Sequence, residues 1–400
     1  MTHATFGRRK ELAVAAFLLA MTLSNVVTGI RLVPLLRAGY QDFTIFYAAA
    51  NMVRSGHTAD LYDLPAQYRA QQQFAPKVGT RQGALPYNHP PFEALFFVPF
   101  TFLPYVPAYL LWTFVNLSML AASLIILGRQ FPEVGTLSPI FLVLVAAGFA
   151  PVASAVIQGQ DSILLLFLCI LALAALNKQR EIAAGAFLAF ALFKFHLVLP
   201  LVLILAVRRW RLLLGFAPVA AALAALSVAM VGWSGAIDYF HFIFGLEKSG
   251  AGGAIVGGDM PNLRGVLSRM PGVHPGSAIF VSLTVACSIA LVLIVMWRVR
   301  TKHTALRFAF TLATVVAILV SYHTLTYDLS LLLPVVLLLL TAPTDQNGSQ
   351  TRADTILFVL VYLLPFCEPF WPRLNQFWFL PVVYWIFSEL GRRQPAGVSA

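Results

Sequence analysis

Long apolar runs separated by short polar segments make up most of the chain. Runs of roughly 18 or more apolar residues are typical of helices that span a lipid bilayer. The strands of a membrane barrel would alternate apolar and polar residues instead, and the sequence has no such alternation. The pattern therefore predicts an all-α, polytopic bundle of about 10–12 transmembrane helices. The expected spans lie near residues 12–30, 105–128, 138–157, 162–176, 182–195, 197–207, 211–231, 277–297, 304–321, 329–342, 355–366 and 376–390.

Several of these runs are shorter than the roughly 20 residues that a membrane span needs, so two short neighbours can also form one re-entrant pair. The whole chain, residues 1–400, is expected to be a single integral-membrane domain. The sequence shows no soluble domain, no internal repeat and no charged tail that would divide it.

The two longest polar segments cover residues 31–104 and 232–275. Within the first, apolar residues recur at the spacing of one helix face, and Asp42 stands where an N-cap would be. This pattern predicts an amphipathic helix that lies at the membrane interface and ends at Ser55–Gly56. The residues of its apolar face are Phe43, Phe46, Tyr47, Ala50 and Val53.

The distribution of basic residues predicts the orientation, because positive charge collects in cytoplasmic loops. With both termini in the cytoplasm, the cytoplasmic segments hold 16 of the 27 Lys and Arg residues. The two long segments, 31–104 and 232–275, are then on the outer face of a cytoplasmic membrane. Three short corners join them there, at residues 158–161, 194–196 and 321–330.

Composition narrows the class of function. Of the 400 residues 59% are hydrophobic and 11% are charged, and the net charge of +11 is explained by the cytoplasmic loops without a nucleic-acid partner. Three scattered cysteines without a CxxC motif argue against a disulfide framework and a zinc site. The chain has no P-loop, GxSxG, HExxH or dinucleotide fingerprint, and no inverted repeat of the kind found in ion-coupled transporters. No DxD motif is present either, so we expect no cofactor and no essential metal.

Ionisable residues at a membrane face are costly and therefore candidates for function, but each also has a structural interpretation. Asp42 can cap its helix, and Asp328 can cap the next span. Lys194 and His196 can extend their polar ends to the membrane surface. Glu93 and Asp161 are interpreted as mostly structural.

Several sequence blocks, in order, resemble glycosyltransferase family 87 over residues 38–340. These proteins are integral-membrane sugar transferases of the GT-C fold that use polyprenyl-phosphate sugars. The chain departs from the family pattern in two places: a usual "YPP" reads "NHPP", so that His89 replaces an aromatic residue, and a usual "KP" reads Lys194-Phe195-His196. The blocks are "QDFTIFYAAANMVRSGHTADLYD", "YNHPPFEALFFVPFTFLP", "LWTFVNL", "QGQDSILLL", "LFKFHLVLPLVL", "PNLRGVL" and "SYHTLTYDLSLLLPVVLLLL".

The resemblance implies a role for each candidate residue. Enzymes with the GT-C fold use a carboxylate in the first outer segment as general base, and Asp42 is the residue that matches. The leaving lipid phosphate needs cations at the outer face. The residues expected to bind the donor phosphate or the substrates are Lys194, His196, Arg264, His323, Asp328, His89 and Gln160.

The resulting hypothesis is an inverting transfer of a hexose, with mannose as the expected sugar, from a polyprenyl-phosphate donor to a glycan or lipid acceptor. Two alternatives stay open at this point. One is a flippase or transporter of lipid-linked sugars, which should present charges deep in the bundle and on both sides. The other is a non-catalytic membrane subunit.

Overall fold

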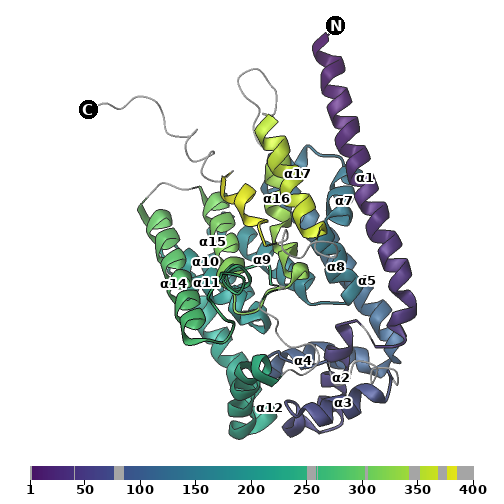
Figure 1. Cartoon of the computed structure of the whole chain (residues 1–400), viewed down its shortest axis with the longest axis vertical. Helices are drawn as coiled ribbons and strands as arrows, with labels where there is room; N and C mark the ends of the chain where they lie inside the picture. Colours follow the sequence, from purple (N-terminus) through teal and green to yellow (C-terminus); the bar gives the residue numbers. More distant parts are fainter. Residues whose placement is uncertain are drawn as a thin grey trace.

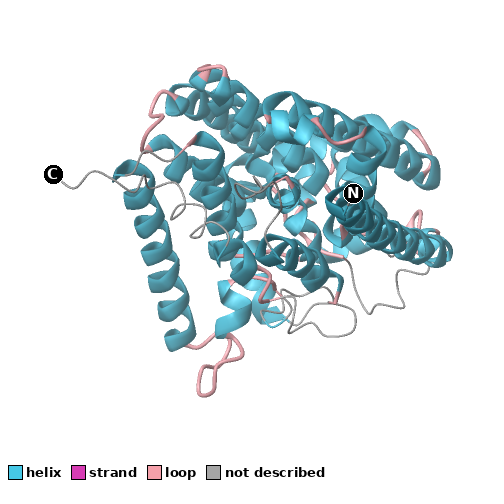
Figure 2. Cartoon of the chain, turned by 90° about the horizontal axis from the view of Figure 1, so that it is seen from above, coloured by secondary structure: helices cyan, strands magenta, loops and turns pink. Residues whose placement is uncertain are grey.

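The computed structural model describes residues 2–39, 41–75, 85–249, 258, 260–301, 305–341, 352–367 and 376–384. Among these residues every regular element is helical, and Figure 2 shows helices and loops without a strand. The predicted all-α fold is confirmed. The α-helices are α1 Thr2–Leu36, α2 Phe43–Arg54, α3 Leu64–Gln72, α4 Pro91–Phe97, α5 Tyr105–Gln130, α6 Pro132–Gly135, α7 Pro139–Gly148, α8 Ala150–Gln158, α9 Ser162–Asn177, α10 Glu181–Phe190, α11 Phe195–Ala206, α12 Leu212–Ser249, α13 Leu263–Leu267, α14 Ala278–Thr301, α15 Leu306–Val320, α16 Leu333–Leu340 and α17 Arg352–Phe366. The 3₁₀ helices are η1 Thr58–Asp60, η3 Val98–Phe102, η4 Ala191–Lys194 and η6 Thr326–Leu332.

The length and composition of the helices make the chain a multi-pass membrane protein. The prediction of about 10–12 spans counted most of the apolar helices that are too short to cross a membrane as spans. Five stretches are long and apolar enough to cross a membrane: Leu12–Leu36, Tyr105–Gln130, Glu181–Ala206, Leu212–Ile243 and Ala278–Arg300. The bent pair α7 and α8 raises this number to 6. The shorter apolar helices are Pro91–Phe102, Ser162–Asn177, Leu306–Val320, Thr326–Leu340 and Ile356–Phe366.

The stretch Glu181–Ala206 is folded back on itself. A straight helix of this length would be about 39 Å long. Arg209, just beyond its end, nevertheless lies against Glu181 at its start, with Nη1 and Oε1 3.1 Å apart. The 3₁₀ turn η4 joins the two arms, α10 and α11, and its last residue is Lys194. The runs expected near 182–195 and 197–207 are therefore the two arms of a hairpin with Lys194 at its tip.

The span expected near 138–157 is broken. Helices α7 and α8 meet at an angle of 72°, and Phe149 between them is extended, with φ −75° and ψ 109°. Pro151 stands in the first turn of α8, where its missing amide hydrogen cannot continue the hydrogen bonds of α7. The apolar run alone did not reveal this break, because the run continues through both halves.

Helices α2, α3 and α4 lie together at the end of the bundle opposite the N-terminus (Figure 1). The predicted helix after Asp42 is present as α2, and it ends at Arg54, next to Ser55 and Gly56. Most of its residues are buried, because α3, α4 and η3 surround it. Even Thr44 is enclosed and pairs its hydroxyl with that of Tyr105 at 2.8 Å. The helix, amphipathic in sequence, is therefore packed against neighbours over most of its surface.

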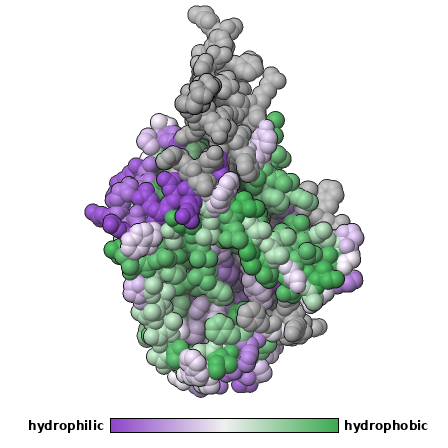
Figure 3. Space-filling model, turned by 90° about the vertical axis from the view of Figure 1, so that its left-hand side faces the viewer, coloured by the Kyte–Doolittle hydropathy of each residue, from purple (hydrophilic) through white to green (hydrophobic). Residues whose placement is uncertain are grey.

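The outer surface of the bundle is apolar where helices face outward. Figure 3 shows a broad hydrophobic region across the middle of one face, with hydrophilic residues gathered above it and toward its lower edge. Large exposed apolar side chains on α5, α12 and α14 include Phe114, Trp233 and Trp297. Such exposure is compatible with lipid contact and would be unfavourable in water.

Candidate functional site

The short corners between helices converge on one cavity of about 170 Å³. These corners come from parts of the chain that are far apart in sequence. Every residue predicted to take part in the site is described, and all except Arg264 line this cavity. The lining includes Asp42, Asn88, His89, Gln160, Lys194, His196, Tyr322, His323 and Asp328. Of the polar segment 81–91, residues 85–91 are described, and Leu85, Pro86 and Asn88 line the cavity.

Helix α5 fixes the corner between α8 and α9. Tyr109, Trp112 and Asn116 follow one another along one face of α5, and their side chains donate to the carbonyl oxygens of residues 157, 159 and 160 at 2.7, 2.8 and 3.3 Å. Gly159 has a φ of 63°, and a Cβ there would lie 2.8 Å from the Cβ of Phe43. Glycine thus permits both the turn and the close approach of α2. The corner presents the side chain of Gln160 to the start of that helix.

Asp42 stands at the start of α2, but it does not act as the expected cap. Its backbone is already helical, with φ −65° and ψ −19°, and its carboxylate makes no hydrogen bond to the described amides of the helix. Oδ2 instead accepts a hydrogen bond of 2.7 Å from Nε2 of Gln160. The capping interpretation is therefore corrected, and the carboxylate is directed into the cavity wall.

Lys194 is held by three acceptors inside the bundle. Its Nζ lies 2.9 Å from Asp161 Oδ1, 2.5 Å from Asp328 Oδ1 and 2.8 Å from Ser162 Oγ. Two of these contacts are hydrogen bonds, to Asp328 and Ser162, and the third, to Asp161, is an ion pair. The expected extension of Lys194 to the membrane surface is not observed, since the side chain is buried. A phosphate that binds Lys194 must replace one of these acceptors.

Asp328 has the predicted capping role together with its ion pair. Its Oδ2 accepts the backbone amide of Leu325 at 3.0 Å, at the start of η6. Its Oδ1 accepts from Lys194 and from the hydroxyl of Ser162. One carboxylate thereby connects η6, α9 and the tip of the α10–α11 hairpin.

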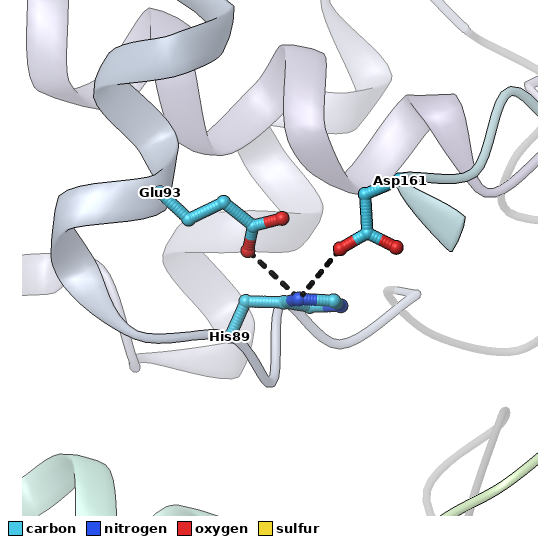
Figure 4. A group of neighbouring side chains, drawn as sticks. All are labelled: His89, Glu93 and Asp161. Atoms are coloured by element: carbon cyan, nitrogen blue, oxygen red, sulfur yellow. Dashed lines mark ion pairs between the residues drawn. The ribbon is translucent and has the colours of Figure 1, made fainter. Parts of the chain in front are cut away.

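A third group consists of His89, predicted to bind the substrates, and of Glu93 and Asp161, interpreted from the sequence as mostly structural (Figure 4). Nδ1 of His89 lies 2.7 Å from Glu93 Oε2 and 3.5 Å from Asp161 Oδ2. Burial lowers the pKa of His89 to about 4. Burial, together with the nearby Asp161 carboxylate, raises the pKa of Glu93 well above its usual value. Sequence spacing did not reveal this group, because Asp161 comes from a different corner.

His196 and His323 are linked through Ser321. The hydroxyl of Ser321 donates to the carbonyl oxygen of His323 at 2.8 Å and lies 2.7 Å from Nδ1 of His196. Since that hydroxyl has only one hydrogen, a neutral His196 must donate from Nδ1, which leaves Nε2 as an acceptor. Burial lowers the pKa of His323 to about 4, an effect that Lys194 and Arg264 reinforce and Asp328 opposes. At neutral pH His323 is therefore an uncharged contact.

Arg264 lies behind the cavity wall. It belongs to α13, which is capped by the side chain of Asn262. Its guanidinium carbon lies 4.6 Å from the ring centroid of Tyr322, and Nη1 donates to the carbonyl oxygen of Tyr322 at 3.2 Å. Tyr322 separates Arg264 from the cavity, so Arg264 acts on it through its charge and through the position of that ring.

The sequence profile of glycosyltransferase family 87 matches residues 87–321. The match includes the corners that carry His89, Gln160, Lys194 and His196, while Asp42 precedes it. No curated protein and no solved structure matches the chain. Because the match covers more than half of the chain, this multi-pass membrane protein belongs to glycosyltransferase family 87 and is a membrane glycosyltransferase.

Proposed function

We propose that the protein transfers a hexose, mannose, from a polyprenyl-phosphate donor to a glycan or lipid acceptor, with inversion at the anomeric carbon. The reaction takes place at the outer face of the cytoplasmic membrane. The observation that carries this proposal is the position of Asp42, whose carboxylate lines the cavity and does not cap its own helix.

In the proposed reaction the acceptor hydroxyl attacks the anomeric carbon, and Asp42 takes the hydroxyl proton. The bond between the anomeric carbon and the phosphate oxygen breaks as the new glycosidic bond forms, and the polyprenyl phosphate leaves. A single displacement of this kind inverts the configuration of that carbon. The hydrogen bond from Gln160 holds the Asp42 carboxylate in one orientation.

Another part of the cavity lining is the proposed site of the phosphate leaving group. Lys194 and Asp328 line it, together with the uncharged imidazole of His323. Positive charge from Lys194 and, behind Tyr322, from Arg264 stabilises the developing phosphate charge. The side chain of Gln160 and the Nε2 acceptor of His196 are available for hydroxyl groups of the sugar.

The arrangement of buried charges supports a transferase over a flippase. A flippase should present charges along the bundle and toward both ends. Among the described residues, the fully enclosed ion pairs of Asp161, Lys194 and Asp328 all lie beside this one cavity. The pair Arg307–Glu133, by comparison, is partly exposed.

Sugar transfer by the purified protein tests the proposal directly. The full chain, in lipid nanodiscs, is incubated with radiolabelled polyprenyl-phosphate mannose and a membrane extract as the acceptor source. Labelled product that depends on the protein is the expected result. Absence of transfer with polyprenyl-phosphate mannose and with the corresponding glucose donor, from protein that is monodisperse, would overturn it.

A further inference from the structure

The group of His89, Glu93 and Asp161 has the geometry of a ligand set. One ligand atom from each residue lies within 4.8 Å of the other two. Nδ1 of His89 and both carboxylate oxygens of Glu93 are buried, and apart from the contacts within this group none has a hydrogen-bond partner in the described part of the chain. Figure 4 shows both carboxylates directed at the imidazole ring. Such buried polar atoms are rare in folded proteins and indicate a missing partner.

The separations bracket those of ligands that share one metal ion. Two donor atoms, each about 2.1 Å from one ion, are roughly 3.0–3.4 Å apart for octahedral to tetrahedral angles. The contacts from His89 to Glu93 and to Asp161, at 2.7 and 3.5 Å, lie on either side of that range.

Neighbouring contacts leave the ligand atoms available. Lys194 occupies Oδ1 of Asp161, while Oδ2 is the oxygen nearest to His89. Pro90 and Pro91 directly follow His89, and α4 then places Glu93 one helical turn further on. His89 also lines the cavity, so that an ion bound there has a route of entry and faces the substrates.

The charge balance of the cavity favours a cation at this point. Asp42 and Asp328 line it and Glu93 and Asp161 lie against His89 in its wall, whereas Lys194, in the lining, and Arg264, behind it, supply the permanent positive charges. The sum is negative, and it stays negative even when one carboxyl group holds a proton. A phosphate that enters such a cavity is repelled unless another cation is present.

We propose that His89, Glu93 and Asp161 bind a divalent transition-metal ion at the wall of this cavity. One imidazole and two carboxylates suit Mn²⁺ or Zn²⁺ rather than a soft, thiolate-loving ion. Such an ion balances the carboxylates and attracts the donor phosphate; this last role rests on the proposed transferase function, whereas the site itself does not. We expected no essential metal because the sequence has no short metal-binding motif. The proposed ligands escaped that search because Asp161 is far from His89 and Glu93 in the chain.

Metal binding by the full chain, without any sugar donor, tests the proposal. Chelator-treated, desalted protein is titrated with Mn²⁺, and electron paramagnetic resonance measures the free aquo ion. One saturable site per chain is expected. Zn²⁺ added in competition should release the bound Mn²⁺.

The decisive variant is Glu93→Gln. A glutamine keeps the size of the side chain and can donate to Asp161 as a protonated glutamic acid would, but it is a poor metal ligand. We expect the affinity for Mn²⁺ to fall at least about tenfold, since even loss of an outer-shell partner has an effect of that size. Glu181→Gln, which removes a carboxylate at the base of the α10–α11 hairpin, should bind Mn²⁺ like the wild type.

Two results would overturn the metal site. One is the lack of saturable Mn²⁺ binding by folded wild-type protein. The other is equal affinity in Glu93→Gln and wild type, which would show that Glu93 is a protonated donor to Asp161. If either result is obtained and sugar transfer also persists in excess chelator, the transferase function stands and only the metal site is rejected.

Discussion

The amide of Gln160 donates to the carboxylate of Asp42 at 2.7 Å, although 118 positions separate the two residues in the chain. The contact joins the start of α2 to the corner between α8 and α9. It fixes the carboxylate in the cavity and offers a direct way to examine its role.

Asp42→Asn is expected to abolish most of the transfer activity while the protein stays folded. The amide keeps the size of the side chain but cannot take a proton, and loss of a general base lowers rates by about 10²–10⁴. The measurement is kcat with the thermal midpoint beside it. Asp63→Asn is the matched control, because Asp63 caps α3 through the amide of Ala66, and asparagine caps about as well. An Asp42→Asn protein with near wild-type kcat would move the base elsewhere.

Gln160→Glu is expected to shift the pH dependence of the reaction. A second carboxylate beside Asp42 disfavours its ionised form, so the acidic limb of kcat/KM should move to higher pH. Gln160→Ala removes the hydrogen-bond donor without adding charge and should lower kcat with a smaller displacement of that limb. Superimposable profiles for Gln160→Glu and wild type would show that Asp42 does not control the limb.

Lys194→Met is expected to destabilise the fold strongly. Removal of the ammonium group leaves Asp161 and Asp328 buried without their partner, and breaking a buried pair from one side costs about 3–5 kcal/mol. Thermal unfolding in detergent measures this loss, and Lys178→Met, at an exposed position, serves as the control.

The double variant Lys194→Met with Asp328→Asn removes one positive and one negative charge together. It should recover part of the lost stability, and the donor KM can then be measured on folded protein. If Lys194 also binds the phosphate, that KM rises about tenfold to a hundredfold. A donor KM like that of the wild type would assign the phosphate contact to other groups.

Acidification is expected to lower stability between about pH 6.5 and pH 4 through His323. The unfolded chain has an ordinary histidine pKa near 6.5 and takes up the proton first, whereas burial lowers the pKa of His323 in the folded protein to about 4. The stabilisation is therefore complete above pH 6.5 and is lost on the way to pH 4, by up to roughly 3 kcal/mol.

Thermal midpoints across this pH range measure the effect. Lys194, Arg264, Asp328 and His196 surround His323, so its share is isolated by comparing His323→Gln with the wild type. The exposed His57→Gln serves as the control. An identical pH slope in His323→Gln and wild type would contradict the assignment.

The proposed orientation predicts opposite accessibility for two loops. In single-cysteine variants, Asp60→Cys should react with an impermeant reagent added outside cells, and Gln179→Cys only after the membrane is opened. Gly252 is also expected outside, and it lies beyond the described residues. Labelling of position 179 in intact cells would invert the map and place the cavity in the cytoplasm.

The sequence predicted the elements that depend on local pattern. Apolar runs identified the helices, and the spacing of Phe43, Phe46 and Tyr47 identified α2 together with its first residue. The same reasoning grouped the corners at one face, because successive spans must alternate in direction, and the structure does bring His89, Gln160, Lys194 and Asp328 to one cavity. Their chemical roles remain predictions.

Long-range partners could not be predicted in this way. The carboxylates that hold Lys194 come from the corner before α9 and from η6, and no spacing rule connects them to the hairpin. The orientation of Asp42 depends on how closely Gly159 lets α2 approach, which is a packing effect. For the same reason the break at Phe149 and the group around Glu93 appear only when neighbouring helices are in place.

The short arms of the α10–α11 hairpin determine the depth of Lys194 in the bilayer. From the Arg209–Glu181 contact at its base, α11 rises about 18 Å, and α10 with η4 rises about 23 Å. The hydrocarbon layer of a typical bilayer is about 30 Å thick. With its base at the level of the near headgroups, the tip at Lys194 stops short of the far ones, and in the proposed reaction the donor phosphate must descend below its resting level, or the bilayer must thin locally to meet it. The acyl-chain length of the surrounding lipid thus becomes a variable of the reaction, with longer chains carrying the headgroups away from the site and slowing transfer.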